Sequence, residues 1–282
     1  MRPLDEYIKS QLNQHLERLE NLFESDFLAI IAPIIPGLDR VIRDALEKKE
    51  KKRPNLVIML DTPGGVVEVV ARIVYAIRFH YNEVYFVVPN RAMSAGTVFV
   101  MSGNKIYMDY FSCLGPIDPQ IEREGKLVPA LSYLSQFKKL NKKAEEGSLT
   151  GAEYALINKM DPGELQQFEE SRNLSIELLK NWLSKYKFKN WQITETRKKR
   201  VTQKMREKRA KNIASKLSDN ERWHSHGIGI NMETLQKELN LKIENLAEKA
   251  EHQKAVKEYF ELLVDYMSRE KIDIFVHTKE YF

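Results

Sequence analysis

The chain has 282 residues, of which 43% are hydrophobic and 30% charged, a balance typical of a folded globular protein that excludes global disorder. The single cysteine, Cys113, cannot form an internal disulfide, so we expect a cytoplasmic protein rather than a secreted one. No run approaches the roughly 20 uninterrupted apolar residues of a membrane-spanning helix, and residues 1–18 lack the apolar core of a signal peptide. We expect a soluble chain, for which peripheral contact with a membrane stays open.

Short apolar runs alternate with amphipathic stretches in the first part of the chain. Apolar residues recur at helical spacing in three stretches, at residues 4–23, 38–46 and 66–77. Four short, mainly apolar runs predict buried strands, at residues 27–35, 56–60, 84–88 and 105–108. Because this alternation is typical of a parallel sheet with right-handed crossovers, the sequence predicts an α/β fold.

Beyond about residue 125 the pattern changes to helices, at residues 165–186, 202–217, 232–239 and 246–267. We therefore divide the chain into an α/β core, residues 1–125, and a mostly helical C-terminal region, residues 126–282.

The positive charge of the chain is concentrated in one segment. Residues 194–211 hold nine Lys or Arg and two Glu, so they carry +7, whereas the whole chain carries +5. If residues 197–211 are helical, charge surrounds most of the helix and leaves only a thin apolar seam of Val201, Met205 and Ile213. We expect a solvated arm or lid. No aromatic residue interleaves with these charges, so we expect no specific nucleic acid partner.

Two turns follow consecutive predicted strands, where α/β sheets usually build their sites. Residues 61–65 read Asp-Thr-Pro-Gly-Gly, and glycines at such a turn leave backbone amides that can face an oxyanion. Residues 92–97 read Ala-Met-Ser-Ala-Gly-Thr, and Ser94 on a tight turn is suited to be a nucleophile. Either turn alone has a structural explanation, since Ser94 could simply cap the next helix, but the pair is more specific.

With these two turns the chain resembles the superfamily of Clp proteases and signal peptide peptidases, which shares the crotonase-like fold. Residues 62–65 match the turn that supplies the oxyanion hole in that superfamily, and residues 93–96 match the motif of its serine nucleophile. The closer likeness is to the serine dehydrogenase proteinase branch, over roughly residues 20–270. It is supported by three further segments, residues 114–120, 161–165 and 222–227.

The resemblance implies a Clp-like parallel-sheet core with a helical C-terminal part. It also implies that Ser94 is the nucleophile and that amides of Gly64 or Gly65 and of Ala95 form the oxyanion hole. Clp-type enzymes take the base from a histidine before a Gln-Pro pair, and residues 115–119 contain no histidine.

Two pairs of residues are candidates for the missing base. Peptidases of the signal-peptide type use a downstream lysine, which would be Lys138 or Lys139 here, and a lysine can act only if desolvation lowers its pKa. His224 and His226 are the other pair, because imidazole titrates near neutral pH, although both could simply fix their loop by hydrogen bonds. Asp118 either orients the base or caps the turn before Pro119.

The sequence favours a serine hydrolase that acts on peptide or protein substrates. The same fold also supports acyl-CoA chemistry. Enzymes of that kind usually have two acidic residues in place of Ser94, and the motif contains no such pair. The non-enzymatic alternative is a catalytically degenerate scaffold that binds a partner or nucleic acid through residues 197–211. We expect no cofactor and no metal, and, as the resemblance implies, a homo-oligomer that encloses its sites. The chain has no ATPase motif, so an unfoldase would be a separate chain.

Overall fold

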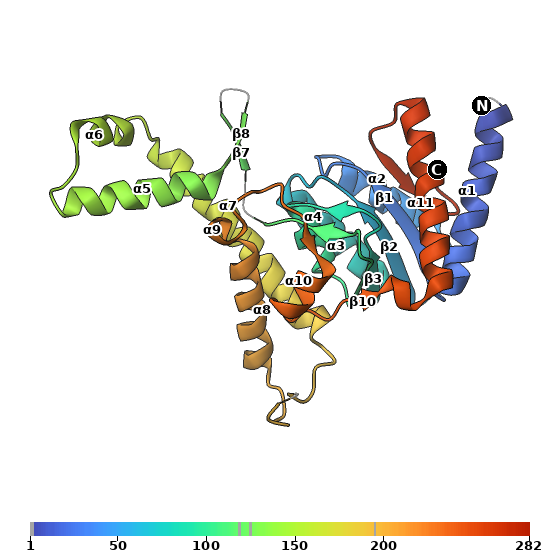
Figure 1. Ribbon diagram of the computed structural model, residues 1–282. Coiled ribbons are helices and arrows are strands. Elements are labelled where there is room, and N and C mark those ends of the chain that lie inside the picture. The colour runs from blue at the N-terminus through green and yellow to red at the C-terminus, as the bar shows by residue number, and fades with distance from the viewer. Residues whose placement is uncertain (1–2, 118–119, 124–125, 195) are drawn as a thin grey trace.

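A computed structural model describes residues 3–117, 120–123, 126–194 and 196–282 (Figure 1). Within these residues a six-stranded sheet has the order β10-β5-β3-β2-β1-β11. Its strands are β1 (Asp26–Ile31), β2 (Asn55–Asp61), β3 (Glu83–Val87), β5 (Lys105–Met108), β10 (Glu244–Asn245) and β11 (Phe275–His277). Paired strands are parallel except for β11, which runs antiparallel to β1. The predicted α/β fold with a parallel sheet is confirmed.

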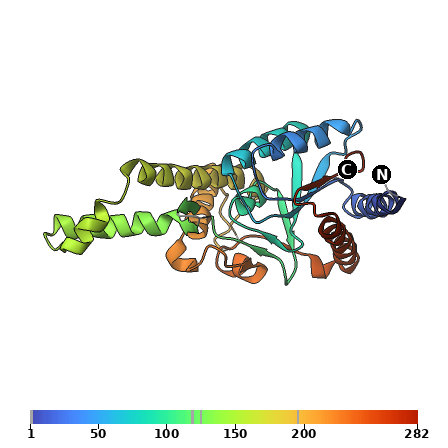
Figure 2. The same ribbon diagram turned by 90° about the horizontal axis from the view of Figure 1, so that it is seen from above.

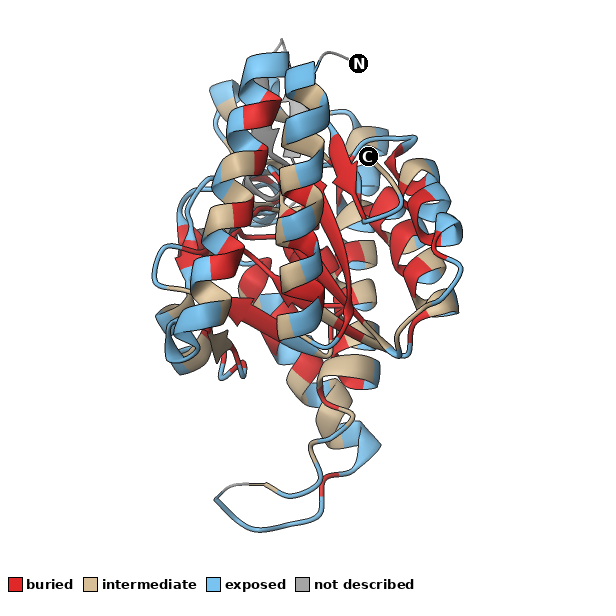
Figure 3. Ribbon diagram, turned by 90° about the vertical axis from the view of Figure 1, so that its right-hand side faces the viewer, coloured by how far each residue is buried: buried red, intermediate tan, exposed pale blue. Residues whose placement is uncertain are grey.

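The two faces of this sheet are covered by different helices (Figure 2). One face is covered by two helices, α1 (Pro3–Leu22) and α11 (Ala250–Glu270). The other is covered by α2 (Leu38–Lys48), α3 (Val67–His80), α4 (Ala95–Val100), α7 (Pro162–Trp182) and α8 (Gln203–Leu217). Because successive side chains of a strand point to opposite faces, Phe27 of β1 joins the first core and Leu28 the second. Figure 3 shows the buried residues of α1 and α11 facing the sheet.

The C-terminal part of the chain returns to the sheet at both edges. The edge strands β10 and β11 both come from beyond residue 125, where the sequence predicted only helices. A second, three-stranded sheet joins β4 (Arg91–Ala92) and β6 (Cys113–Leu114) to β9 (Ile230–Asn231). The shorter helices of this part are α9 (Asn220–Trp223), α10 (Met232–Lys237) and the 3₁₀ turn η2 (Leu246–Glu248). The strands β9, β10 and β11 have only two or three residues each, which is too few for an alternating pattern in the sequence to predict them.

An arm projects from the body of the molecule (Figure 1). It contains the hairpin of β7 (Gln120–Arg123) and β8 (Lys126–Pro129), α5 (Ala130–Glu145), α6 (Gly151–Ile157) and the first part of α7. Leu134 of α5 packs against Leu165 and Phe168 of α7 in a small core of its own. The second part of α7 runs back to the body and ends in the π-helical turn η1 (Leu183–Lys187).

The basic helix predicted at residues 202–217 is present as α8, which begins after the capping residue Thr202, and residues 197–202 precede it. Its packing differs from the expectation. The apolar side of α8 is buried in the main core, through Ala210, Ile213, Ala214 and Leu217. The prediction that this helix is a solvated arm is therefore wrong. Most of its basic residues lie in its first half, and the small residues Ala210 and Ala214 widen the apolar side that packs into the core. None of the described helices is long and apolar enough to span a membrane.

Candidate active site

The turn after β2 depends on two glycines. Gly64 and Gly65 have φ angles of 99° and 145°, which L side chains rarely adopt. A Cβ on Gly65 would lie 2.1 Å from the carbonyl oxygen of Ile34, and one on Gly64 would lie 2.8 Å from Cβ of Ser94. The turn is held by Ile34, whose N–H donates to the Gly64 carbonyl and whose carbonyl accepts from Val66, both at 2.8 Å. Glycine is thus required here for close approach as well as for conformation.

Ser94 lies on the second turn, between β4 and α4. Its φ of 52° and ψ of −118° are unusual for a residue with a side chain, and such strain is typical of a nucleophile at a strand-to-helix turn. Ser94 is the N-cap residue of α4, yet its side chain makes no capping hydrogen bond. The alternative that Ser94 is present to cap the helix is therefore wrong, because its hydroxyl accepts no hydrogen bond from the first turn of α4.

The two turns are bonded to each other. The N–H of Met93 donates to the carbonyl of Thr62 at 3.0 Å, and the N–H of Thr62 donates to the carbonyl of Arg91 at 3.0 Å. The carboxylate of Asp61, at the end of β2, accepts from the N–H of Arg91 at 3.3 Å and from the side chain of Asn90 at 3.2 Å. Burial raises the pKa of Asp61, although both hydrogen bonds act against the increase. The nucleophile turn is thus fixed against the glycine turn by backbone and side-chain bonds.

The small residues of the second turn permit this contact. A Cβ on Gly96 would lie 2.4 Å from Cγ2 of Thr62, so only glycine lets α4 begin so close to the first turn. Thr97 then ties α4 to the segment after β6, because its hydroxyl lies 2.8 Å from the carbonyls of Ala92 and Gly115 and accepts from the N–H of Gly115 at 3.0 Å.

Two backbone N–H groups beside Ser94 are available for a ligand. The N–H of Gly64 donates to the hydroxyl of Thr62 at 3.1 Å. In contrast, within the described part of the chain, the N–H groups of Gly65 and Ala95 have no acceptor. Of the two glycines that the sequence offered as an oxyanion donor, Gly65 has the free amide.

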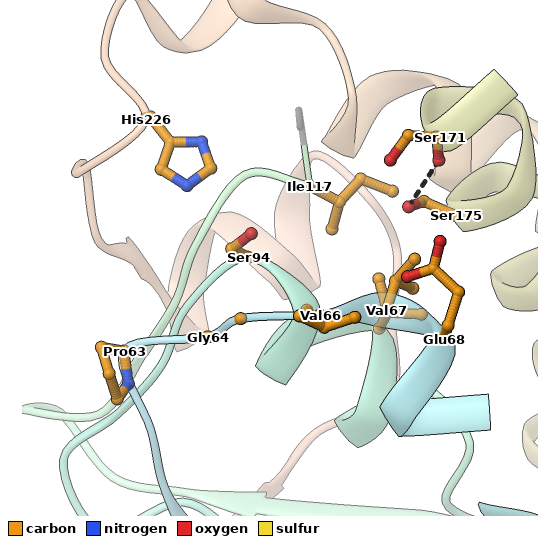
Figure 4. A pocket seen from close by; sticks show the side chains of 13 residues that line it. Pro63, Gly64, Val66, Val67, Glu68, Ser94, Ile117, Ser171, Ser175 and His226 are labelled. Atoms are coloured by element: carbon orange, nitrogen blue, oxygen red, sulfur yellow. Dashed lines mark hydrogen bonds between the residues drawn. The ribbon is translucent and has the colours of Figure 1, made fainter. Parts of the chain in front are cut away.

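A pocket of about 500 Å³ opens beside Ser94 (Figure 4). Its lining combines residues of both turns with residues from far along the sequence. They are Pro63, Gly64, Gly65, Val66, Val67, Glu68, Ser94, Ala95, Val98, Ile117, Ser171, Ser175 and His226. Ser94, Gly64, Gly65, Ala95 and His226, all of which the sequence singled out, are therefore brought together.

The four candidate bases lie in different surroundings. His226 is half-buried and lines the pocket, whereas His224 is exposed and does not line it. Lys138 lies on α5 in the arm, where its side chain is 67% exposed and its Nζ is 3.7 Å from Glu169. Lys139 is also exposed and does not line the pocket. Asp118 lies outside the described residues. In the part of the chain that is described, no cluster of His, Cys, Asp or Glu could hold a metal ion.

Sequence reasoning did not predict seven residues of the pocket as site residues, namely Val66, Val67, Glu68, Val98, Ile117, Ser171 and Ser175. Glu68 could have been found, because it stands in the first turn of the helix that follows the two glycines. Ser171 and Ser175 lie in the middle of α7 and carry no motif, so only the packing of α7 beside α4 shows that they reach the site.

The parallel sheet and the two linked turns place the protein among the ClpP-like α/β proteins. Residues 34–199 match the family model described as ClpP-like SDH-type serine proteinase. Since this match covers more than half of the chain, the chain belongs to that family, which confirms the resemblance inferred from the sequence.

Curated relatives match a shorter segment. The chain is 36% identical over 87 residues to one uncharacterized protein of Methanocaldococcus jannaschii, and 29% identical over 92 residues to a second one from the same organism. These matches cover 31% and 33% of this chain and 30% of the length of each relative. The chain thus spans about a third of the curated relatives that it matches.

Solved structures show a distant likeness. Two variants of the 1510-N membrane-bound stomatin-specific protease, the second in complex with a substrate peptide, are 14% and 16% identical to this chain, with TM-scores of 0.45 and 0.46. The matches cover 76% of both chains in the first case, and 77% of this chain and 73% of the other in the second. ClpP1 from Listeria monocytogenes is 12% identical, with a TM-score of 0.43 over 80% of this chain and 94% of the other.

Proposed function

We propose that this protein is a serine peptidase in which Ser94 attacks the substrate carbonyl. The observation that carries the proposal is the state of Ser94 itself. Its backbone is held in a strained conformation, its hydroxyl caps no helix, and it lines a pocket of about 500 Å³. Strain of this kind persists only where the surrounding structure enforces it, and it is common at catalytic turns.

The amides of Gly65 and Ala95 are the oxyanion donors in this proposal. Attack by Ser94 converts the carbonyl oxygen into an oxyanion, which these two N–H groups would stabilise, since neither has an acceptor among the described residues. Both amides belong to residues that line the pocket with Ser94. Glycine at position 65 leaves its amide unshielded, because no side chain covers it.

His226 is the proposed general base. It would take the proton of the Ser94 hydroxyl as the bond to the carbonyl carbon forms, and give it to the leaving amine as the peptide bond breaks. His226 is favoured over His224, Lys138 and Lys139 because it alone of these four lines the pocket.

The substrates in this proposal are peptides or proteins, and the protein works as a homo-oligomer. Enclosed sites would keep an unselective hydrolase away from folded proteins. Light scattering at micromolar concentration is expected to give a mass well above the 33.0 kDa of one chain.

The test is labelling by a fluorophosphonate probe, which reacts only with an activated serine. We expect the wild-type protein to be labelled at Ser94 and Ser94→Ala not to be labelled. Ser171→Ala, which removes another hydroxyl of the same pocket, is the matched control and should still be labelled. Absence of labelling in the folded wild-type protein would contradict the proposal and favour the catalytically degenerate scaffold.

A further inference from the structure

The pocket beside Ser94 has two chemically different ends. In Figure 4, Ser94 and His226 lie at one end, and Glu68, Ser171 and Ser175 point toward one another at the other. Glu68 comes from the first turn of α3, and the two serines come from consecutive turns of α7. The reacting end and this polar end are therefore built by different elements.

The passage between the two ends is apolar. Val67, Val98 and Ile117 line it with side chains that are themselves packed into the body of the protein. Such a wall favours a substrate side chain with a methylene stem, since each buried CH₂ is stabilised by transfer out of water. A short polar side chain would leave this wall exposed to water.

The polar end consists of hydrogen-bond acceptors. Ser175 is buried, and its hydroxyl donates to the backbone carbonyl of Ser171 at 3.1 Å, so its lone pairs remain free to accept. Glu68 is the one carboxylate among the described residues that line the pocket, and no Lys or Arg is among them. The nearest basic residue on its helix, Arg72, is paired with Asp39 at 2.8 Å.

We propose that this pocket selects substrates with Lys or Arg at the residue whose carbonyl Ser94 attacks, and that Glu68 pairs with the cationic end. The inference rests on the proposed function of Ser94. Lysine and arginine combine an apolar stem with a cationic group that only donates, which complements an apolar passage that ends in acceptors. The attacked residue has its Cα one bond from the carbonyl carbon, so its side chain is the first that can enter the pocket.

The experiment compares peptide substrates that differ in this one residue. Arginine and citrulline have nearly the same shape, but citrulline is neutral, so the ratio of their kcat/KM values isolates the charge. We expect a preference of up to about fivefold for arginine over citrulline in the wild-type protein, the size of an ion pair with an exposed carboxylate such as Glu68. Glu68→Gln should reduce the ratio to about one, and Glu68→Lys should reverse it.

Glu146→Gln is the control for a carboxylate outside the pocket, and it should keep the wild-type ratio.

Probe labelling of Ser94 separates the two proposals. If Ser94 is labelled and the arginine and citrulline substrates are cleaved equally well, the inference fails while the proposed function stands. If Ser94 is not labelled, the proposed function fails. In that case binding still tests the pocket, because fluorescence anisotropy of the two peptides with Ser94→Ala should show tighter binding of arginine, and equal binding overturns the inference.

Discussion

The two faces of the main sheet use polar groups in opposite ways. On the face with α3 and α4, the amides of Gly65 and Ala95 have no acceptor in the described chain, and Ser94 is strained. On the face with α1 and α11, buried polar groups are paired. The ring of His277 contacts Tyr259 at 2.6 Å through Nδ1 and Asn13 at 3.0 Å through Nε2. Beside a pocket, one face leaves donors without an acceptor among the described residues, and the other face has a buried, paired polar network.

This difference predicts which property a substitution changes. Unpaired donors and strained backbone cost stability and are retained where they serve a reaction, so changes there should alter activity more than folding. Removing one partner of a buried polar pair leaves the other unsatisfied, so changes on the α1 and α11 face should alter stability alone. The predictions below compare buried, paired polar groups with the groups beside the pocket.

The largest effect is expected at Lys49, a buried, paired group that follows α2 and contacts α1 and β1. Its buried Nζ lies 2.9 Å from Glu20 and 3.4 Å from Asp26. Burial opposes the charge of this ammonium, but the hydrogen bond to Glu20 and the nearby carboxylates outweigh burial and raise the pKa of Lys49. Lys49→Met should lower the free energy of unfolding by about 3–5 kcal/mol, because two buried carboxylates lose their counter-charge.

Urea denaturation measures this change, and the matched control is Lys142→Met. Lys142 forms an exposed pair with Glu146, which should contribute no more than about 1 kcal/mol. Probe labelling of the folded Lys49→Met protein should stay near the wild-type rate. A loss of labelling without a loss of stability would contradict the contrast between buried, paired groups and the groups beside the pocket.

The next effect is expected at Gly65. A Cβ there would overlap the carbonyl of Ile34, so Gly65→Ala must displace the turn and its amide. We expect the labelling rate of Ser94 to fall by about 10²–10³, as when one oxyanion donor is lost. Gly37→Ala is a matched control, since Gly37 also has a positive φ, of 102°, but open space around it. Equal labelling rates for the two variants would show that the Gly65 turn is only structural.

Much of the fold could be predicted from the sequence because its strongest signals are local. Strands β1, β2, β3 and β5 were marked by apolar runs, although the run expected to reach residue 35 ends at Ile31, before Pro33. The edge strands β10 and β11 were missed because their pairing depends on contacts with residues far away in the sequence. The site divides in the same way. The two turns carry local motifs, whereas Ser175 contributes through the packing of α7 alone.

A smaller change in rate is expected at the base. His226→Gln should lower the labelling rate by about 10²-fold, because a glutamine cannot accept the proton of Ser94. His224→Gln is the matched control two residues away, and its exposed ring does not line the pocket. The comparison is sharpened by Lys138→Met, which removes a basic group of the arm. If only Lys138→Met slows labelling, the base is this lysine, brought to the site by another subunit.

The smallest expected effect is the change in the free energy of unfolding with pH, one unit at a time, that His277 causes on the α1 and α11 face. The amide oxygen of Asn13 can only accept, so Nε2 of His277 carries the proton and Nδ1 accepts from the hydroxyl of Tyr259. Burial, aided by the charge of Lys9, lowers the pKa of His277 to about 3. A histidine in the unfolded chain binds its proton near pH 6.5, so between these values the unfolded state binds more protons. This residue should therefore lower the free energy of unfolding by about 1.4 kcal/mol for each pH unit of acidification.

Urea unfolding at pH 7, 5.5 and 4 measures this slope. In His277→Gln, which does not titrate at this position, the slope should be smaller by that amount. A slope in His277→Gln equal to that of the wild-type protein would mean that His277 is protonated in the folded state, and that this face is not closed by a neutral network.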